Sequence, residues 1–229
     1  MGPIRRRVSE AAKTYASTGS GEPVTDRRNR VRTAYDELAD TYDDRRADEP
    51  PEASLIEEFV DRLPADAHVL DAGCGGGEPI TRRLASEVRV TGLDFSWTQV
   101  AMASDRLPET GFVQGDLTAH PFSSEGFDGV ISAFAVIHVP WDEHAAVFEE
   151  FHRVLSPAGP LLVSVGSDDW AGSTDDWLGS GTEMHWSQPG PDRTRALLQD
   201  AGFTVEGTER VADTIGDEAG EKVFVWAHA

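Results

Sequence analysis

Residues 69–77 have the sequence VLDAGCGGG. Apolar residues lead into the acidic Asp71, and glycines follow at positions 73, 75, 76 and 77, shortly before a helical segment that begins near Pro79. This order is typical of a β-strand that turns into an α-helix around a ligand, because glycine permits a tight turn and leaves no side chain to block close approach. The segment therefore predicts an α/β fold with a ligand at the glycine loop.

The rest of the chain repeats the same unit, since short apolar runs alternate with helical stretches. The pattern predicts a mostly parallel sheet covered by helices on both faces. Seven strands are expected, with the sequences HVLDA, VRVTGLD, GFVQGD, FDGVISAFAVI, GPLLVSVG, FTVEGTERV and KVFVWAHA. Helices are expected at about 79–86, 96–107, 141–155 and 192–201.

The first part of the chain has a different composition. Residues 1–30 are rich in Arg, Ser, Thr and Gly without apolar periodicity, which predicts a mobile N-terminal arm. From Val31 apolar residues recur at helical spacing, and a second helix is expected over 53–63. We expect residues 31–63 to form a helical cap on a single domain that spans 31–229, because 229 residues suffice for one α/β domain.

The charge of the chain excludes several classes of partner. There are 41 acidic residues against 20 basic ones, and the net charge is -21. Such a surface repels nucleic-acid phosphates and anionic lipid heads, so neither nucleic acid nor membrane is expected as a partner. It also predicts an adaptation to high salt, where screening weakens self-repulsion. An acidic protein without this adaptation is the other interpretation.

Cysteine usage and hydropathy indicate the compartment. Cys74 is the only cysteine, so an intrachain disulfide and a cysteine-based zinc site are both impossible. No stretch approaches the roughly 18 to 20 continuous apolar residues of a membrane span, and the start lacks the apolar run of a secretory signal. We expect a soluble, cytoplasmic protein.

Two details of the glycine loop distinguish its ligand. The glycines follow a GxGxG pattern, whereas dinucleotide-binding loops follow GxGxxG, and carboxylates stand at Asp71 and Glu78. A pyrophosphate would face these carboxylates as a like charge in a partly buried cleft, at a cost in energy. S-adenosylmethionine carries an ammonium and a sulfonium instead, and the acidic loop favours such a cation.

Acidic residues also follow the next two strands. Asp94 ends VTGLD, the position from which a carboxylate accepts hydrogen bonds from both ribose hydroxyls. Asp116, in VQGDL, stands where it can accept from an adenine amino group while Leu117 packs on the ring. Each aspartate alone is as readily a loop residue or a helix cap. Together with the glycine loop they favour a nucleoside-containing cofactor at the carboxyl ends of the strands.

With these motifs the chain resembles the class I S-adenosylmethionine-dependent methyltransferases, in particular the group that acts mostly on small molecules. The resemblance rests on LDAGCGGGEPIT, GLDFS, QGDL, FDGVISAFAVIHVP and FHRVLSPAGPLLVSV, and it covers roughly Val31 to the C-terminus. It implies a seven-stranded, mostly parallel Rossmann-like sheet whose last strand, VFVWAHA, is antiparallel. One departure is Trp97, where the family usually has a small or polar residue. Its bulky indole is expected near the adenine edge, where it narrows the pocket or forms its wall.

The resemblance also implies a set of contacts with S-adenosylmethionine. The loop from Gly73 to Gly77 would hold the methionine part, Asp94 the ribose, and Asp116 with Leu117 the adenine. The predicted cofactor-binding residues are Asp71, Gly73, Cys74, Gly75, Gly77, Asp94, Phe95, Asp116, Leu117, Ala133, Phe134 and Tyr42.

The sequence contains weaker signals for the residues that contact the methyl acceptor. Transfer from a sulfonium is a direct displacement that needs alignment and exclusion of water more than a fixed triad. His138, in AVIHVP, is the candidate general base, and a structural histidine is the alternative. Tyr42 is a candidate ligand for the cofactor's carboxylate, helped by Arg45 or Arg46; core packing and solvent exposure are the alternatives.

Residues 167–191 form a polar stretch that is unusually rich in aromatic residues. It contains Trp170, Trp177 and Trp186 together with Met184 and His185. We interpret it as an acceptor lid whose rings exclude water and stack on a flat or cationic acceptor. A satellite hydrophobic cluster under a long loop is the alternative. Its aspartates are expected to be solvated, and no metal site is expected.

The sequence thus favours an enzyme that transfers a methyl group from S-adenosylmethionine to an O, N or C nucleophile of a small molecule, as a monomer or homodimer. A cofactor-binding or interaction protein with the same fold and no turnover is the first alternative. A nicotinamide-dependent oxidoreductase is the second, and the glycine spacing and Asp71 disfavour it.

Overall fold

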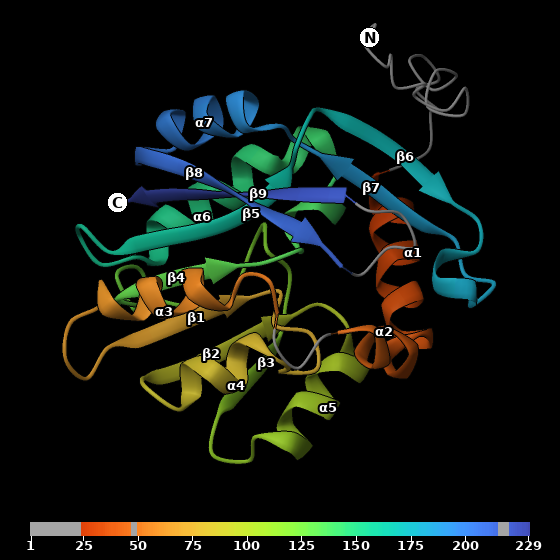
Figure 1. Ribbon diagram of the computed structural model, residues 1–229, viewed down its shortest axis with the longest axis horizontal. Helices are drawn as coiled ribbons and strands as arrows, with labels where there is room; N and C mark the ends of the chain where they lie inside the picture. Colours follow the sequence, from red (N-terminus) through yellow and green to blue (C-terminus); the bar gives the residue numbers. More distant parts are fainter. Residues whose placement is uncertain (1–23, 47–49, 215–219) are drawn as a thin grey trace, which may run out of the picture.

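The seven expected strands form one sheet in the computed structural model, which describes residues 24–46, 50–214 and 220–229. The strand order is β3-β2-β1-β4-β5-β9-β8, and β9 alone runs opposite to the other six strands of this sheet (Figure 1). The bounds are β1 His68–Ala72, β2 Arg89–Asp94, β3 Gly111–Gln114, β4 Gly129–Ser132, β5 Pro160–Gly166, β8 Thr204–Asp213 and β9 Gly220–His228. The predicted fold class is confirmed, including its antiparallel last strand.

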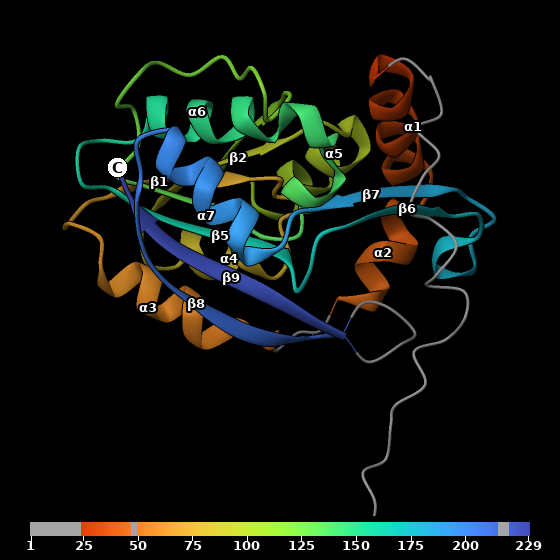
Figure 2. The same cartoon turned by 90° about the horizontal axis from the view of Figure 1, so that it is seen from above.

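Helices cover both faces of this sheet. On one face α3 (Ala53–Asp61) and α4 (Ile80–Ala85) pack against it through the buried Phe59 and Leu84. On the other face α6 (His144–Val154) and α7 (Pro191–Asp200) do so through Phe148 and Leu198 (Figure 2). Helix α5 (Trp97–Arg106) runs beside β2 and β3. Strand β5 is buried along its whole length, and its apolar sequence PLLVSVG is the composition expected of such a central strand.

The N-terminal helices begin earlier than the sequence indicates. Helix α1 spans Val24–Glu37 and α2 spans Ala39–Arg45. The prediction of an arm over 1–30 is therefore wrong for residues 24–30, and residues 1–23 lie outside the described part. Arg27 explains the extension, because its Nη2 donates to the carbonyl oxygen of Trp186 at 2.7 Å and to Ser187 Oγ at 2.6 Å. The expected helical cap over 31–63 is not a single unit, because α3 packs on the sheet apart from α1 and α2.

The expected lid over residues 167–191 is not a loop. It contains a two-stranded antiparallel ribbon, β6 (Trp170–Thr174) paired with β7 (Met184–Gln188), and the short 3-10 helix η4 (Trp177–Gly179) lies between them. Beside α1 the buried Met184 and the half-buried Trp177 and Trp186 form a small hydrophobic cluster. Figures 1 and 2 both place α1, α2 and the ribbon together, beyond the carboxyl ends of the parallel strands.

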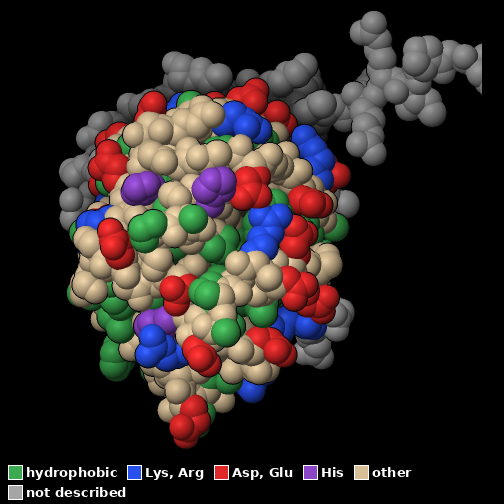
Figure 3. All heavy atoms as spheres, turned by 90° about the vertical axis from the view of Figure 1, so that its left-hand side faces the viewer, with side chains coloured by type: hydrophobic (Ala, Val, Ile, Leu, Met, Phe, Trp, Pro, Cys, Tyr) green, Lys and Arg blue, Asp and Glu red, His purple; other side chains and the backbone are tan. Residues whose placement is uncertain are grey.

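Acidic side chains are spread over the surface with basic ones between them, as Figure 3 shows for one face. We expect the free energy of unfolding to increase as KCl is raised from about 0.1 M to several molar, because screening reduces the self-repulsion of a chain with a net charge of -21. Urea denaturation at a series of KCl concentrations measures this. Full stability at the lowest salt concentration would contradict an adaptation to high salt.

None of the helices in the described segments is long and apolar enough to cross a membrane.

Candidate functional site

An inner cleft opens at the carboxyl ends of β1 and β4, where the strand order reverses. Ligands of open α/β sheets bind at such a switch point. The cleft is lined by Arg28, Tyr35, Tyr42, Gly73, Gly75, Asp94, Phe95, Gln99, Asp116, Leu117, Ala133, Phe134, Ala135, His138, Val139 and Pro140. All the predicted site residues are on its wall except Asp71, Cys74 and Gly77. Their contacts with a cofactor stay a prediction.

The glycine loop follows β1 and requires glycine at two positions of the cleft wall. Gly73 has φ +89°, and a Cβ there would lie 2.2 Å from Ala135 Cβ, so no side chain fits. Gly75 has φ +54°, and its backbone N–H donates to Asp94 Oδ2 at 2.9 Å. The loop is therefore a backbone cradle, with no side chain at Gly73 or Gly75 and a carboxylate beside it. The carboxylate is an acceptor, and when ionised it suits a cationic ligand.

Asp94, the last residue of β2, is held by two backbone donors. Oδ2 accepts from Gly75 N and Oδ1 from Ser96 N, each at 2.9 Å. Burial raises the pKa of Asp94 to about 6, although these hydrogen bonds act in the opposite direction. The side chain is thus fixed in orientation, and its remaining lone pairs are available to hydroxyl donors in the cleft.

The three predicted residues outside the wall of the inner cleft are Asp71, Cys74 and Gly77. Asp71 is fully buried in β1 and accepts from Thr81 Oγ1 at 2.6 Å, and burial raises its pKa to about 6. It lines a smaller hollow together with Cys74. A Cβ on Gly77 would lie 3.2 Å from Leu107, so this glycine allows the C-terminal end of α5 to approach the loop. Asp71 and Gly77 therefore fix the loop through Thr81 and α5, and the hollow lined by Asp71 adjoins the inner cleft at Gly73 and Gly75.

Sequence reasoning missed Arg28, which reaches from α1 to the far end of the cleft. Its Nη1 lies 2.9 Å from Asp116 Oδ2 and its Nε lies 2.5 Å from Glu143 Oε2. Thr118 accepts from the same guanidinium at 2.8 Å. Arg28 thus covers the carboxylate that was assigned to the adenine. It falls in the segment that was expected to be a mobile arm, so no sequence signal pointed to it.

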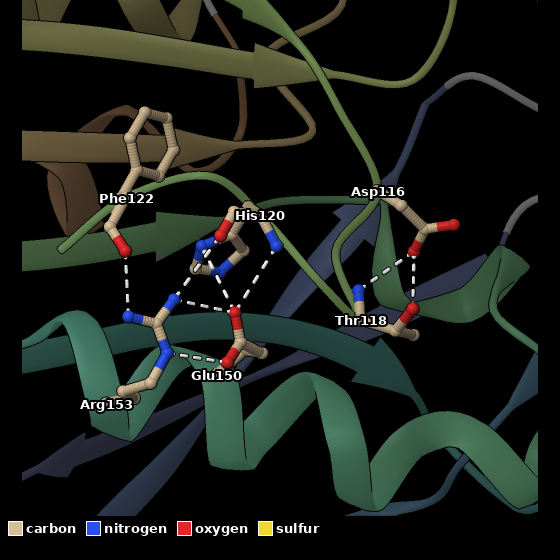
Figure 4. A network of polar contacts seen from close by, with 6 residues as sticks. All are labelled: Asp116, Thr118, His120, Phe122, Glu150 and Arg153. Carbon is tan, nitrogen blue, oxygen red and sulfur yellow. Dashed lines mark hydrogen bonds and ion pairs between the residues drawn. The ribbon is translucent and has the colours of Figure 1, made fainter. Parts of the chain in front are cut away.

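The segment that follows Asp116 is held against α6 by hydrogen bonds, as Figure 4 shows. Asp116 Oδ1 accepts from the backbone N–H and the hydroxyl of Thr118, both at 2.8 Å. Further along, Arg153 donates to the carbonyl oxygen of Phe122 at 2.8 Å and to Glu150 Oε1 at 2.6 Å. The position of Asp116 is therefore set by its own turn and by an ion pair on a neighbouring helix.

A larger outer cavity of about 460 Å³ adjoins the inner cleft. Tyr35, Tyr42, Phe134 and His138 line both spaces, so they form the boundary between them. The rest of its wall comes mainly from the ribbon, η4 and β9: Ile137, Trp170, Thr174, Asp176, Trp177, Leu178, Trp186, Gln188, Asp213 and Lys222.

Phe134 has an unusual backbone at this boundary. Its φ is +61°, which is strained for a residue with a Cβ, and its backbone N–H donates to the buried Ser164 Oγ at 2.5 Å. The guanidinium of Arg46 lies 4.9 Å from the centre of its ring and 3.4 Å from Glu52. Of the two arginines proposed from sequence, Arg46 thus lies near the cleft, whereas Arg45 is exposed.

His138 lies in the short 3-10 helix η2 (Val136–His138) and both of its ring nitrogens are occupied. Nδ1 lies 2.9 Å from the carbonyl oxygen of His185 in β7, and Nε2 lies 2.9 Å from the hydroxyl of Tyr35. Burial lowers the pKa of His138 to about 4. The imidazole is therefore neutral at pH 7 and has no free lone pair, which makes it a poor general base in this arrangement.

Two aromatic residues expected near the ligand lie at the surface. Trp97 is 62% exposed and lines neither the inner cleft nor the outer cavity, so it does not narrow the pocket or form its wall. Trp170 is 42% exposed at the edge of the outer cavity. The contact of α5 with the cleft comes from Gln99 instead, a residue not predicted from the sequence.

The aspartates of residues 167–191 hold the ribbon and its connections. Asp169 accepts from Gly190 N at 2.7 Å and Asp176 accepts from Gly181 N at 2.5 Å. Among the described residues no group of three or more His, Cys, Asp or Glu side chains is arranged to hold a metal ion.

Fold and site together define a class: an α/β protein with a glycine cradle and an acidic strand end for a nucleoside cofactor, and a separate cavity beside it. Residues 69–159 match a family model described as a methyltransferase domain. A 2-phytyl-1,4-naphtoquinone methyltransferase of Thermosynechococcus vestitus is 30% identical over 62% of this chain and 74% of its own length.

Further comparisons agree with this match. A trans-aconitate 2-methyltransferase of Escherichia coli is 28% identical over 74% of this chain and 63% of its own length. The crystal structure of a methyltransferase from Methanosarcina mazei superposes with a TM-score of 0.66, covering 76% of this chain and 96% of that one at 20% identity, which shows the fold. The chain belongs to the class I S-adenosylmethionine-dependent methyltransferases, and S-adenosylmethionine is its methyl donor.

Proposed function

We propose that the protein methylates a small molecule that binds in the outer cavity. The observation that carries this proposal is the shared boundary, because Tyr35, Tyr42, Phe134 and His138 line both the inner cleft and the outer cavity. A methyl group presented from one side of this boundary faces a nucleophile on the other. The volume of about 460 Å³ lies within the range of small-molecule sites, which is about 300 to 1,000 Å³.

The cleft residues are proposed to hold the cofactor as the sequence predicted. Asp94 would accept the ribose hydroxyls, Asp116 with Leu117 would flank the adenine, and the loop at Gly73 and Gly75 would receive the methionine part. Burial raises the pKa of Tyr42, so this residue keeps its proton and can donate to the cofactor's carboxylate. The bound cofactor supplies an electrophilic methyl group.

The contribution of the chain is alignment and exclusion of water. The rings of Tyr35, Tyr42 and Trp177 lie 5.4 to 5.8 Å apart and form a continuous apolar wall at the boundary. Such a wall removes water that would compete with the acceptor and restricts the directions from which a nucleophile approaches. The rate enhancement is then expected to come mainly from positioning, because no described side chain at the boundary is a free base.

The acceptors of the relatives are named for those proteins, a naphthoquinone in one case and trans-aconitate in the other. We propose a small-molecule acceptor here, no nucleic-acid partner, a cytoplasmic location, and a monomer or homodimer. The support for the exclusion of nucleic acid is the net charge of -21.

Removing the indole of Trp177 tests the acceptor site. We expect Trp177→Ala to weaken acceptor binding about tenfold or more while changing the affinity for S-adenosylmethionine less than threefold, since Trp177 lines the outer cavity only. Methyl transfer to a panel of small molecules and calorimetry with the cofactor measure the two effects. Trp97→Ala is the matched control, because that indole lines neither space. Equal effects of both variants would contradict the placement of the acceptor.

The same experiment addresses the alternative of a binding protein without turnover. Tight binding of S-adenosylmethionine together with no methylated product from any acceptor would favour that alternative. Tight binding of NADH without binding of S-adenosylmethionine would overturn the cofactor assignment.

A further inference from the structure

Tyr35 and His138 form a hydrogen-bonded pair at the boundary between the inner cleft and the outer cavity. The hydroxyl oxygen of Tyr35 lies 2.9 Å from His138 Nε2, and the two rings meet edge to face with centres 5.3 Å apart. The two residues come from α1 and η2, which are 103 residues apart in the chain. Which of the two atoms donates depends on the tautomer of His138.

The carbonyl oxygen of His185 determines this tautomer. This oxygen only accepts, so His138 Nδ1, which lies 2.9 Å away, must carry the ring proton. A neutral imidazole has one N–H, so Nε2 holds a lone pair and the Tyr35 hydroxyl must donate to it. The proton of Tyr35 is thereby engaged by His138 and is not available to a ligand. What Tyr35 presents to a ligand is the lone pairs of its oxygen.

Two further features keep the pair in this state. Burial holds the pKa of His138 low and that of Tyr35 high, so both groups are neutral across the physiological range. Lys222, which is buried in the wall of the outer cavity, also opposes a positive charge on His138. A swap of the donor and acceptor roles would break the hydrogen bond from His138 Nδ1 to the carbonyl oxygen of His185, which costs free energy.

We propose that Tyr35 contacts the reacting atom of the methyl acceptor by accepting its hydrogen, that His138 is a positioning residue, and that the acceptor's nucleophile therefore carries an N–H or O–H bond. This inference rests on the proposed function. Amines, amides, alcohols and phenols belong to this class. Carboxylates are disfavoured because an ionised carboxylate offers no hydrogen to Tyr35, and because Lys222, the cation in the same wall, is already paired with Asp213 at 3.4 Å.

The hydrogen bond would orient the acceptor as well as select it. When the N–H or O–H of the acceptor points to Tyr35, a lone pair of the same atom is left to face the methyl group. The new bond forms between that lone pair and the methyl carbon while the bond from sulfur to carbon breaks. The hydrogen of the nucleophile is released to solvent as a proton, because His138 resists protonation.

Small probes of one shape test this selection without knowledge of the natural acceptor. Phenol and aniline carry a polar hydrogen, fluorobenzene carries none, and benzonitrile only accepts. Binding to the protein loaded with S-adenosylhomocysteine is measured by NMR titration. We expect phenol and aniline to bind about three- to tenfold more tightly than fluorobenzene, and Tyr35→Phe to remove this difference. Equal affinities in the native protein would overturn the proposal.

The role of His138 has its own test, since the pair predicts a change of preference and not only a loss. In His138→Leu the hydroxyl of Tyr35 is free to donate, so benzonitrile should gain affinity relative to fluorobenzene. His138→Gln restores an acceptor for the hydroxyl and should return the native order. A merely structural histidine would shift all four probes together. The comparison is made between variants because Lys222 lines the same cavity and is itself a hydrogen-bond donor, so its effect on the probes cancels.

Nitrogen-15 NMR of the histidine rings provides a measurement that needs no variant. We expect His138 to remain in the neutral form with the proton on Nδ1 from about pH 5.5 to 8. A proton on Nε2 would overturn the proposal. Failure of the underlying function is distinguishable, because then none of the four probes would bind at the outer cavity, whether or not it carries a polar hydrogen.

Discussion

Asp94→Ala is expected to weaken binding of S-adenosylmethionine by about 1 to 3 kcal/mol, or roughly 5- to 150-fold in dissociation constant. The side chain would lose its hydrogen bonds to the cofactor and also release two backbone donors, Gly75 N and Ser96 N, which it now fixes at 2.9 Å. The loss therefore combines a direct contact with the order of the glycine loop. Calorimetry in high KCl measures it.

Two variants separate these contributions. Asp94→Asn keeps one carbonyl acceptor of the same shape but no charge, so we expect an intermediate loss. Asp105→Ala removes an exposed carboxylate from α5 and controls for the change in net charge. Unchanged affinity in Asp94→Ala, with the variant folded, would refute the assignment of this residue to the ribose.

The raised pKa of Asp94 gives the same site a dependence on pH. In the free protein burial places this pKa at about 6, so the carboxyl is protonated below that pH. Ribose hydroxyls and a cationic cofactor both favour the ionised form. The affinity should therefore increase as the pH rises from about 5 to 7 and stay level above, and Asp94→Asn should flatten this rise. For the free protein the sign is opposite, because a raised folded pKa costs stability as the pH rises toward 6.

Much of the fold was predictable because apolar runs and glycines report local conformation. The run VLDA and the glycines after it indicate a strand that turns into a helix around a ligand. The buried run PLLVSVG has the pattern of a central parallel strand. The inner cleft followed from the rule that ligands bind at the carboxyl ends of such strands. The strands and the loop follow from short-range patterns in the sequence, and the place of the cleft follows from the topology that those patterns imply.

What was not predictable depends on contacts between distant segments. The start of α1 at Val24 depends on Arg27 and Arg28, whose partners lie at least 88 residues away. The ribbon was missed because apolar and polar residues do not alternate in WAGST, the partner strand of MHWSQ. The ribbon also packs against α1 and η2 and is not part of the main sheet. The tautomer of His138 is set by a backbone carbonyl, which no side-chain pattern reveals.

Gly73→Ala is expected to cost about 3 to 5 kcal/mol of folding free energy, the largest effect of any single change considered. The new Cβ would lie 2.2 Å from Ala135 Cβ, a distance that forces the backbone of one of the two loops to move, and φ is +89°. Overpacking and an unfavourable backbone conformation each contribute about 1 to 3 kcal/mol. Urea denaturation in high KCl measures the loss.

A compensating variant divides that cost into its two parts. In Gly73→Ala with Ala135→Gly the overlapping Cβ is gone and the remaining neighbour, Ala135 Cα, is at an ordinary 3.6 Å. The double variant should therefore recover the steric part and retain the cost of the positive φ. Gly207→Ala is the control, because a Cβ there meets nothing within 4 Å. If Gly73→Ala were as stable as this control, the close approach of the loops after β1 and β4 would be wrong, and with it the shape of the inner cleft.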